Sequence, residues 1–236
     1  MSALVSDFKQ NFIENARWEY LTNGLKTTLL VTVGAVLLGF ILGFLVAIVR
    51  STHDRTGRMK ILNFLCKIYL TVIRGTPMVV QLMIMYFVIF GSVVFFGSVE
   101  LSKYIVAILA FGINSGAYVA EIVRSGIMAV DSGQIEAGRS LGFSYRQTMR
   151  LIVLPQAFKA VLPALANEFI VLLKETSVAG YIGIVDLTKG GDIIRSQTYS
   201  AFMPLLAVAF IYLVMVMILS HLVQRLERRL AKSDRH

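Results

Sequence analysis

The chain has 236 residues, of which 56% are hydrophobic, and its mean hydropathy is +0.72. These values exclude an ordinary soluble domain and indicate an integral membrane protein. The formal net charge of +9 could suggest a nucleic-acid-binding protein, but the basic residues stand at the ends of apolar segments and form no single patch. We therefore expect a lipid membrane, and no nucleic acid, around this chain.

Neither a disulfide framework nor a metal site is indicated by the sequence. Cys66 is the single cysteine, and its simplest role is that of a small apolar side chain. His53, His221 and His236 are far apart and lack the spacing of metal ligands. We expect no cofactor bound by this chain.

The first segment, 1–23, is mixed in character and does not match a signal peptide. The aromatic residues of this segment, Phe8, Phe12, Trp18 and Tyr20, suit a helix lying at the membrane interface. A loosely ordered tail is an equally good interpretation. We treat 1–23 as an extracytoplasmic amphipathic lead and 24–236 as a single transmembrane domain.

Three uncharged runs that could span a membrane follow the lead, each close to the length of about 20 residues that a spanning helix needs. The first lies between Lys26 and Arg50, and the third covers 104–120. The second is the uncharged part, 75–99, of a hydrophobic run that covers 68–99 and is interrupted at Arg74-Gly75-Thr76-Pro77. The connection 50–67 carries five basic residues against one acidic residue, so the positive-inside rule places it in the cytoplasm. The lead is then outside.

The fourth span is the weakest, because only 14 residues separate Lys159 from Lys174 and Glu168 stands among them. The fifth span, 196–224, is uncharged, and the tail after it is basic and belongs in the cytoplasm. The two ends of the chain can lie on opposite sides only if the chain also crosses between Lys159 and Thr176.

The prediction is an all-α integral membrane protein with five transmembrane helices. Its amino terminus lies outside and its carboxyl terminus in the cytoplasm. The segment 181–199 is balanced in charge and should be external. A helix that tolerates Glu168 should be surrounded by protein or line a path through the membrane.

A polar stretch, 136–155, lies between the third and fourth apolar segments. Upstream of it, Asp131 with Gln134 three residues later predicts a capped helix start. Gly142 stands where that helix should end, at a backbone position that needs a positive φ. The pattern predicts a short cytoplasmic helix followed by a glycine turn.

A second helix start follows the turn directly. Ser144 and Gln147 have the spacing of a capping box, in which each residue satisfies the backbone of the other. Pro155 marks the point where this second helix should bend or stop. Two short helices joined at a glycine are therefore expected at one membrane face.

The same stretch matches a long pattern of fixed spacing. Glu136-Ala137-Gly138, three residues, Gly142, nine residues and Ile152-Val153-Leu154-Pro155 resemble the signature of the membrane-spanning subunits of binding-protein-dependent ABC importers. That signature has Glu-Ala-Ala at its start, and this chain departs from it only at Gly138. An ordinary amphipathic loop with a glycine hinge would not explain the further matches below.

The resemblance implies that this stretch is the coupling helix, which docks in a groove of the ATPase subunit. The cytoplasmic coupling loop would cover about 125–158. Gly142 would need to stay small to fit the groove, with apolar contacts beside it. The residues expected to contact the ATPase are Glu136, Ala137, Gly138, Leu141, Gly142 and Phe143.

Nearly the whole chain resembles the polar amino-acid branch of these importers. The segments that carry this likeness are Arg74-Gly75-Thr76-Pro77 with Gln81-Leu82, Ala117 to Arg124, Leu162 to Ile170, and Lys174-Glu175-Thr176-Ser177. The resemblance implies a permease subunit for a polar or charged amino acid, in the inner or plasma membrane of a bacterial cell.

The same resemblance implies the partners of the chain. Two permease subunits, either two copies or a copy and a paralogue, would enclose the path above two ATPase subunits and below an extracytoplasmic amino-acid-binding protein. The chain contains no Gly-x-x-x-x-Gly-Lys-Ser/Thr phosphate loop, so ATP and Mg would be bound by the ATPase partner. We expect a transport subunit, not an enzyme.

Polar residues within the spans are candidates for the substrate path. Glu168 could bind the ammonium group or cationic side chain of an amino acid, or it could be a buried partner of Arg74 or Lys174. Arg74 could hold a substrate carboxylate or anchor its helix. Gln81, Asn114 and Ser115 could line the path or form interhelical hydrogen bonds, and Lys174 could lie at the outer surface.

Two other functions are possible from the residues alone. A secondary transporter or channel would use Glu168 as an ion or proton site, although no inverted repeat is visible. A membrane scaffold without transport would leave Glu168 and the spacing of the coupling motif unexplained.

Glu121 and Arg124, three residues apart, suit a structural ion pair.

Overall fold

The structure is a computed structural model that describes the backbone of residues 2–233, and all regular secondary structure in this range is helical. The α-helices are α1 (Ser2–Phe8), α2 (Trp18–Thr56), α3 (Lys60–Arg74), α4 (Met78–Met83), α5 (Val99–Ala129), α6 (Ser132–Ser140), α7 (Tyr145–Thr148), α8 (Leu154–Glu175), α9 (Leu187–Thr198) and α10 (Phe202–Ser233). Short π-helical segments, Lys9–Ile13, Ile84–Ile89 and Met149–Val153, and 3₁₀ segments, Glu14–Ala16, Phe95–Gly97 and Thr176–Ile182, extend or join them.

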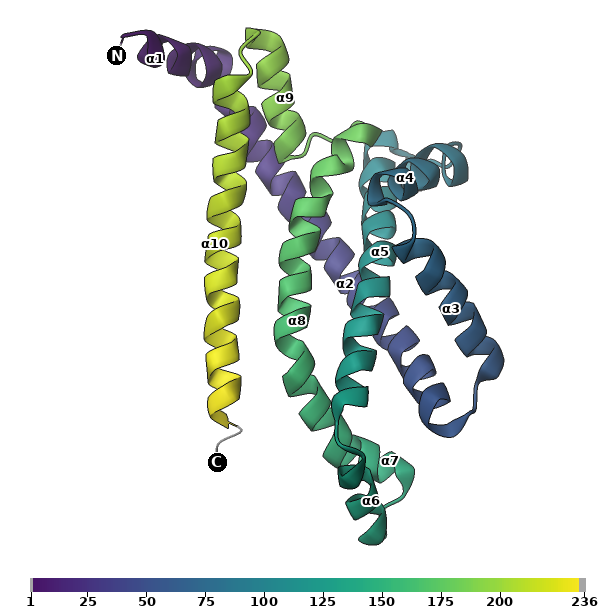
Figure 1. The fold of residues 1–236 in the computed structure, drawn as a ribbon. Helices are drawn as coiled ribbons and strands as arrows, with labels where there is room; N and C mark the ends of the chain where they lie inside the picture. Colours follow the sequence, from purple (N-terminus) through teal and green to yellow (C-terminus); the bar gives the residue numbers. More distant parts are fainter. Residues whose placement is uncertain (1, 234–236) are drawn as a thin grey trace.

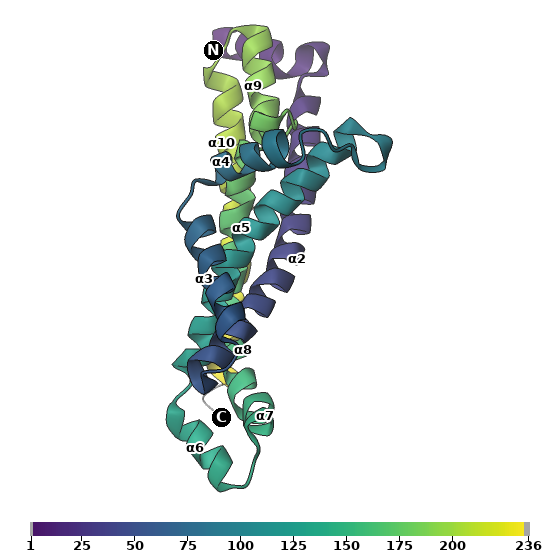
Figure 2. The same ribbon diagram turned by 90° about the vertical axis from the view of Figure 1, so that its right-hand side faces the viewer.

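The long helices α2, α5, α8 and α10 run along the length of the molecule, as Figure 1 shows. The helices α1 and α9 lie at one end, whereas α6, α7 and the last turns of α10 lie at the other (Figures 1 and 2). Within residues 2–233, four helical stretches are long and apolar enough to cross a membrane, or five if a bent pair of helices counts as one span. The predicted all-α fold with five spans agrees with this upper count.

The second span differs from the prediction in its position. The helix α3 begins before the predicted hydrophobic run 68–99, and a bend of 107° separates it from the helical segment Met78–Ile89. Figure 2 shows α4 lying across the direction of α3. The bend falls at Gly75-Thr76-Pro77, where proline removes a backbone donor and disfavours a continuous helix. The sequence marked this interruption but not its angle.

The fourth span is longer than predicted. The helical stretch Tyr145–Ile182 comprises 38 residues and carries the chain from α7 through α8 without a break. Pro155 lies at the start of α8 but inside this continuous helix, where proline cannot donate a backbone hydrogen bond. Just before it, Met149–Val153 is π-helical. The second helix of the coupling motif therefore does not stop near Pro155 but continues into the span.

The centre of the fold is the contact between α2 and α5. A Cβ atom added at Gly43 of α2 would lie only 2.5 Å from Val119 Cγ1, so glycine lets the two helices approach closely. Side chains buried around this contact include Val31, Ala35 and Phe111. Gly43 therefore permits the close packing of α2 against α5.

The lead is ordered along its described length. It is helical in α1 and in the segments that follow, and Asn11 and Phe12 are buried. Thr198 Oγ1, at the end of α9, donates a hydrogen bond of 2.8 Å to Asn11 Oδ1. The described part of the lead is thus largely helical, and its position at a membrane interface stays a prediction. The helix α9 forms within the segment predicted to be an external connection.

Candidate functional site

The coupling motif forms a compact projection of α6 and α7 at one end of the molecule (Figures 1 and 2). Asp131 caps α6, as predicted, but its carboxylate accepts from Gly133 N at 2.6 Å and not from Gln134. Gly142 follows α6 with φ +85°, the left-handed conformation predicted for it. Its N–H donates to Arg139 O at 2.9 Å and closes the helix end.

The start of α7 is the predicted capping box. Ser144 Oγ accepts from Gln147 N, and Gln147 Oε1 accepts from Ser144 N at 2.8 Å. Thr148 Oγ1 adds a hydrogen bond to Ser144 O at 3.2 Å. These local hydrogen bonds stabilise the turn between α6 and α7.

The six predicted coupling residues divide by exposure. Gly138 is buried against α7 and the π-helical segment, and a Cβ added there would lie 2.8 Å from Ile152 Cδ1. Glycine at the position where the signature has alanine therefore permits close packing inside the projection. Phe143 is half-buried. The other four residues are exposed and available to a partner: Glu136, Ala137, Leu141 and Gly142.

A buried polar chain joins the bent second span, α5 and α8. Gln81 Nε2 donates to Ile73 O at 2.7 Å and to Thr76 O at 3.0 Å, which satisfies carbonyls released by the bend. Asn114 Nδ2 donates to Gln81 Oε1 at 3.1 Å. The amides of Gln81 and Asn114 thus form the interhelical hydrogen bonds that were one of the two sequence interpretations.

Next to Asn114 on α5, Ser115 Oγ donates to Glu168 Oε1 at 3.0 Å. Glu168 is only 8% exposed. Among the described residues, neither Arg74 nor Lys174 forms an ion pair with it. The carboxyl group in the middle of α8 therefore has a neutral donor as its neighbour, and no cationic side chain among the described residues pairs with it.

Arg74 and Lys174 lie apart from this polar chain. Arg74 Nη1 is 4.0 Å from Glu121 Oε1, and its guanidinium carbon is 5.7 Å from the centre of the Tyr118 ring. Lys174 is exposed near the end of α8. Of the six predicted path residues, the structure brings four together, Gln81, Asn114, Ser115 and Glu168.

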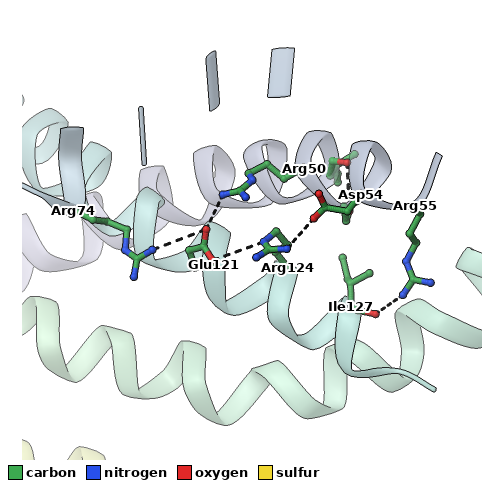
Figure 3. Close-up of polar contacts among 9 residues, drawn as sticks. Arg50, Asp54, Arg55, Arg74, Glu121, Arg124 and Ile127 are labelled. Carbon is green, nitrogen blue, oxygen red and sulfur yellow. Dashed lines mark hydrogen bonds and ion pairs between the residues drawn. The ribbon is translucent and has the colours of Figure 1, made fainter. Parts of the chain in front are cut away.

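An ion cluster that sequence reasoning found only in part joins α2 to α5 (Figure 3). Glu121 Oε1 accepts from Arg50 Nη1 at 2.8 Å, and Glu121 Oε2 lies 3.7 Å from Arg124 Nε, which confirms the predicted Glu121–Arg124 pair. Arg124 also pairs with Asp54 at 2.8 Å, and Arg55 donates to the carbonyl of Ile127 at 2.7 Å. The ion pair of Arg50 was not predicted, because its partner Glu121 is 71 residues away in sequence. The sequence showed Arg50 only as the end of the first span.

Metal binding has no geometric support within residues 2–233. In that part of the chain, no group of three or more His, Cys, Asp and Glu side chains is arranged to hold an ion. The chemistry that the described side chains offer is hydrogen bonding and charge pairing.

Comparison with known proteins places the chain among transport subunits. Residues 39–232 match the family described as the binding-protein-dependent transport system inner membrane component. The chain is 36% identical over 210 residues to the glutamine transport system permease protein GlnP of Escherichia coli (strain K12), and this alignment covers 89% of this chain and 92% of GlnP. It is 36% identical over 215 residues to the arginine transport system permease protein ArtQ of Bacillus subtilis (strain 168), covering 91% and 94%.

Solved structures show the same architecture. A crystal structure of an amino acid ABC transporter with histidines contains a chain that is 41% identical, with a TM-score of 0.81 and coverage of 92% of this chain and 98% of the other. The inward-facing MetNI methionine ABC transporter shares the fold at 22% identity, with a TM-score of 0.74. The chain belongs to the family of binding-protein-dependent transport system inner membrane components, the multi-pass permease subunits of ABC importers.

Proposed function

We propose that this chain forms the translocation path of an importer for a polar or charged amino acid. The observation that carries the proposal is the likeness, at 36% identity over about nine tenths of the chain, to permeases named for glutamine and for arginine. ATP hydrolysis in this family belongs to separate ATPase subunits. Family membership favours this function over a secondary transporter or channel.

The projection of α6 and α7 is the proposed contact with the ATPase subunit, in the cytoplasm. The amino terminus would then lie outside and the carboxyl terminus in the cytoplasm. Leu141 and Gly142 are exposed in the turn between α6 and α7, and Phe143, next to them in the chain, is half-buried. Two ATPase subunits, a second permease that is either a copy or a paralogue, and an extracytoplasmic amino-acid-binding protein complete the proposed assembly.

The proposed mechanism uses the continuity between the projection and the fourth span. The helix Tyr145–Ile182 runs from α7, where the capping box holds it, to the part of α8 that carries Glu168. Closure of the ATPase pair on ATP would displace the projection. Because one helical rod links the projection to Glu168, that displacement would move the polar chain and open the path to alternate sides of the membrane.

Glu168 is the proposed substrate contact within the path. A charged side chain at the centre of a spanning helix costs about 2.5–3.5 kcal/mol on insertion scales, so its retention indicates a role. With Ser115 as its neutral neighbour, the carboxylate can bind the ammonium group of an amino acid. Gln81 and Asn114 would hold α4 against α5 at the same level, while Arg74 and Lys174 would act at the two ends of the path.

Substitution of Gly142 by aspartate tests the coupling assignment. Gly142→Asp should insert normally but lose transport by at least tenfold, because a bulky anion would occupy the tip of the projection. Uptake of radiolabelled glutamine and arginine by cells, normalised to the amount of protein in the membrane, measures this loss.

Gly57→Asp is the matched control for this variant. Gly57 also follows a helix at a positive φ, +68°, and a Cβ atom at either glycine would meet nothing within 4 Å. The control should transport normally, since it carries the same backbone strain away from the projection. Wild-type uptake in Gly142→Asp, or an equal loss in both variants, would refute the coupling assignment.

A further inference from the structure

A basic cavity opens between α2, α3 and α5, beside the ion cluster drawn in Figure 3. Its volume is about 450 Å³. Three cations, one hydroxyl group and one carboxylate face it: Arg50, Lys67, Arg74, Thr71 and Glu121. Lys67, which sequence reasoning did not single out, lies on the same face of α3 as Thr71 and Arg74, at positions i, i+4 and i+7.

The described residues do not balance the positive charge around the cavity. Glu121 already forms an ion pair with Arg50 at 2.8 Å and lies 4.0 Å from Arg74. Arg124 forms ion pairs with both Glu121 and Asp54. Lys67 has no ion-pair or hydrogen-bond partner among the described residues. Four cations, Arg50, Lys67, Arg74 and Arg124, thus face two carboxylates, Glu121 and Asp54, and two positive charges remain.

The geometry of the excess cations suits an anion with several oxygen atoms. A guanidinium group presents paired N–H donors that match a carboxylate or a phosphate, and an ammonium group adds a point charge. Arg50 is 13% exposed and sits deep in the cluster, and its Nε is buried without a hydrogen-bond partner in the described part of the chain. The side chain of Arg74 is 45% exposed and can reach an incoming group.

The surroundings of the cavity suggest how such a group would approach. The adjacent face of α3 is apolar and exposed, with Phe64 63%, Ile68 46% and Val72 54% exposed. An amphiphile could lie along that face with its headgroup among the cations, as basic pockets between spans bind anionic headgroups. The carboxylate of an amino acid in the path offers the same chemistry.

We propose that this cavity is a binding site for a carboxylate or phosphate group, held by Lys67 and Arg74 against Arg50. The anion supplies the negative charge that the protein lacks there. Because the site sits where α2, α3 and α5 meet, its occupant stabilises the contact between the bent second span and the rest of the fold.

The test measures equilibrium binding to the purified permease, with the subunits that co-purify, in phosphatidylcholine nanodiscs without ATP. Two probes are titrated separately, short-chain phosphatidylglycerol and glutamine. The variant Lys67→Gln/Arg74→Gln removes two charges from the cavity. The control Arg58→Gln/Lys60→Gln removes two charges at the amino-terminal end of α3, where neither residue lines the cavity.

The cavity variant should bind at least one probe about tenfold more weakly than wild type, whereas the control should bind both normally. Loss of phosphatidylglycerol binding assigns the anion to a lipid headgroup, and loss of glutamine binding assigns it to a substrate carboxylate. Equal binding of both probes by wild type and the cavity variant, or no binding by wild type, would overturn the proposal. Since ATP takes no part, that failure would leave the importer assignment untouched.

Discussion

Asp186 shows how a single residue can cap a helix at a cost in free energy. It is 1% exposed, and its carboxylate accepts from Lys189 N at 3.0 Å and Thr188 N at 3.2 Å at the start of α9. Burial raises the pKa of Asp186 to about 6, and these backbone hydrogen bonds oppose the rise. The carboxyl group therefore takes up its proton at a higher pH in the folded state than in the unfolded state.

This difference predicts a pH dependence of stability. Between about pH 4 and pH 6 the folded state binds more protons than the unfolded state, so the free energy of unfolding falls as pH rises through that window. A pKa of about 6 against the ordinary aspartate value of about 3.9 corresponds to about 3 kcal/mol. Asp186→Asn keeps a good capping side chain and removes the titration.

The measurement is the apparent melting temperature of the purified permease in detergent from pH 4.5 to 7. The fall with rising pH should be smaller in Asp186→Asn than in wild type. Asp192→Asn is the control, because Lys189 and Arg195 hold the pKa of Asp192 below its usual value and it stays ionised across the window. Identical pH profiles for wild type and Asp186→Asn would contradict the assignment.

At the scale of elements, the 107° bend between α3 and α4 needs partners for the backbone groups that it releases. Within a membrane, water does not satisfy such groups, so a side chain must do so. Gln81 fills this role with its contacts to Ile73 O and Thr76 O, and Asn114 fixes the orientation of its amide. The bend is thus tied to α5.

Replacement of Gln81 by leucine should destabilise the permease by about 1–3 kcal/mol, because carbonyl groups at the bend lose their donor. The apparent melting temperature in detergent should fall accordingly. Gln197→Leu removes an exposed glutamine that donates to Tyr20 Oη at 3.3 Å and should have little effect. A Gln81→Leu variant as stable as wild type would show that the bend does not depend on this amide.

Local features of the coupling motif could be predicted from sequence, whereas tertiary features could not. The positive φ of Gly142 and the capping box at Ser144 depend on neighbouring residues only, and both are present. The fourth span was recoverable because charge counting required a crossing. The Arg50–Glu121 pair depends on the register between α2 and α5, which no local pattern encodes.

The residues of the buried polar chain were predictable as candidates, but their arrangement was not. Buried Glu168 stood out by its cost in a spanning segment, and its contact with Ser115 needed the packing of α8 on α5. The bend after Arg74 was visible as Gly-Thr-Pro, but its angle depends on how Gln81 and Asn114 pair. The sequence therefore identified the residues of the polar chain but not which residue each one contacts.

At the scale of the whole molecule, one continuous helix connects the proposed coupling surface with the proposed substrate contact. The projection of α6 and α7 stands at one end, and Tyr145–Ile182 links it to the buried polar chain (Figure 1). The ion cluster of Arg50, Glu121 and Arg124 holds α2 and α5 together beside that helix. Such an arrangement suits a subunit that receives mechanical work from an ATPase partner.

The most direct test of this account is uptake by proteoliposomes that contain the permease with its co-purified subunits and an external binding protein. Radiolabelled glutamine and arginine are supplied outside, and ATP is either enclosed or omitted. The account predicts uptake of at least one amino acid that requires enclosed ATP and persists when proton and sodium gradients are collapsed. Uptake by this chain alone, driven by either gradient without ATP, would contradict it.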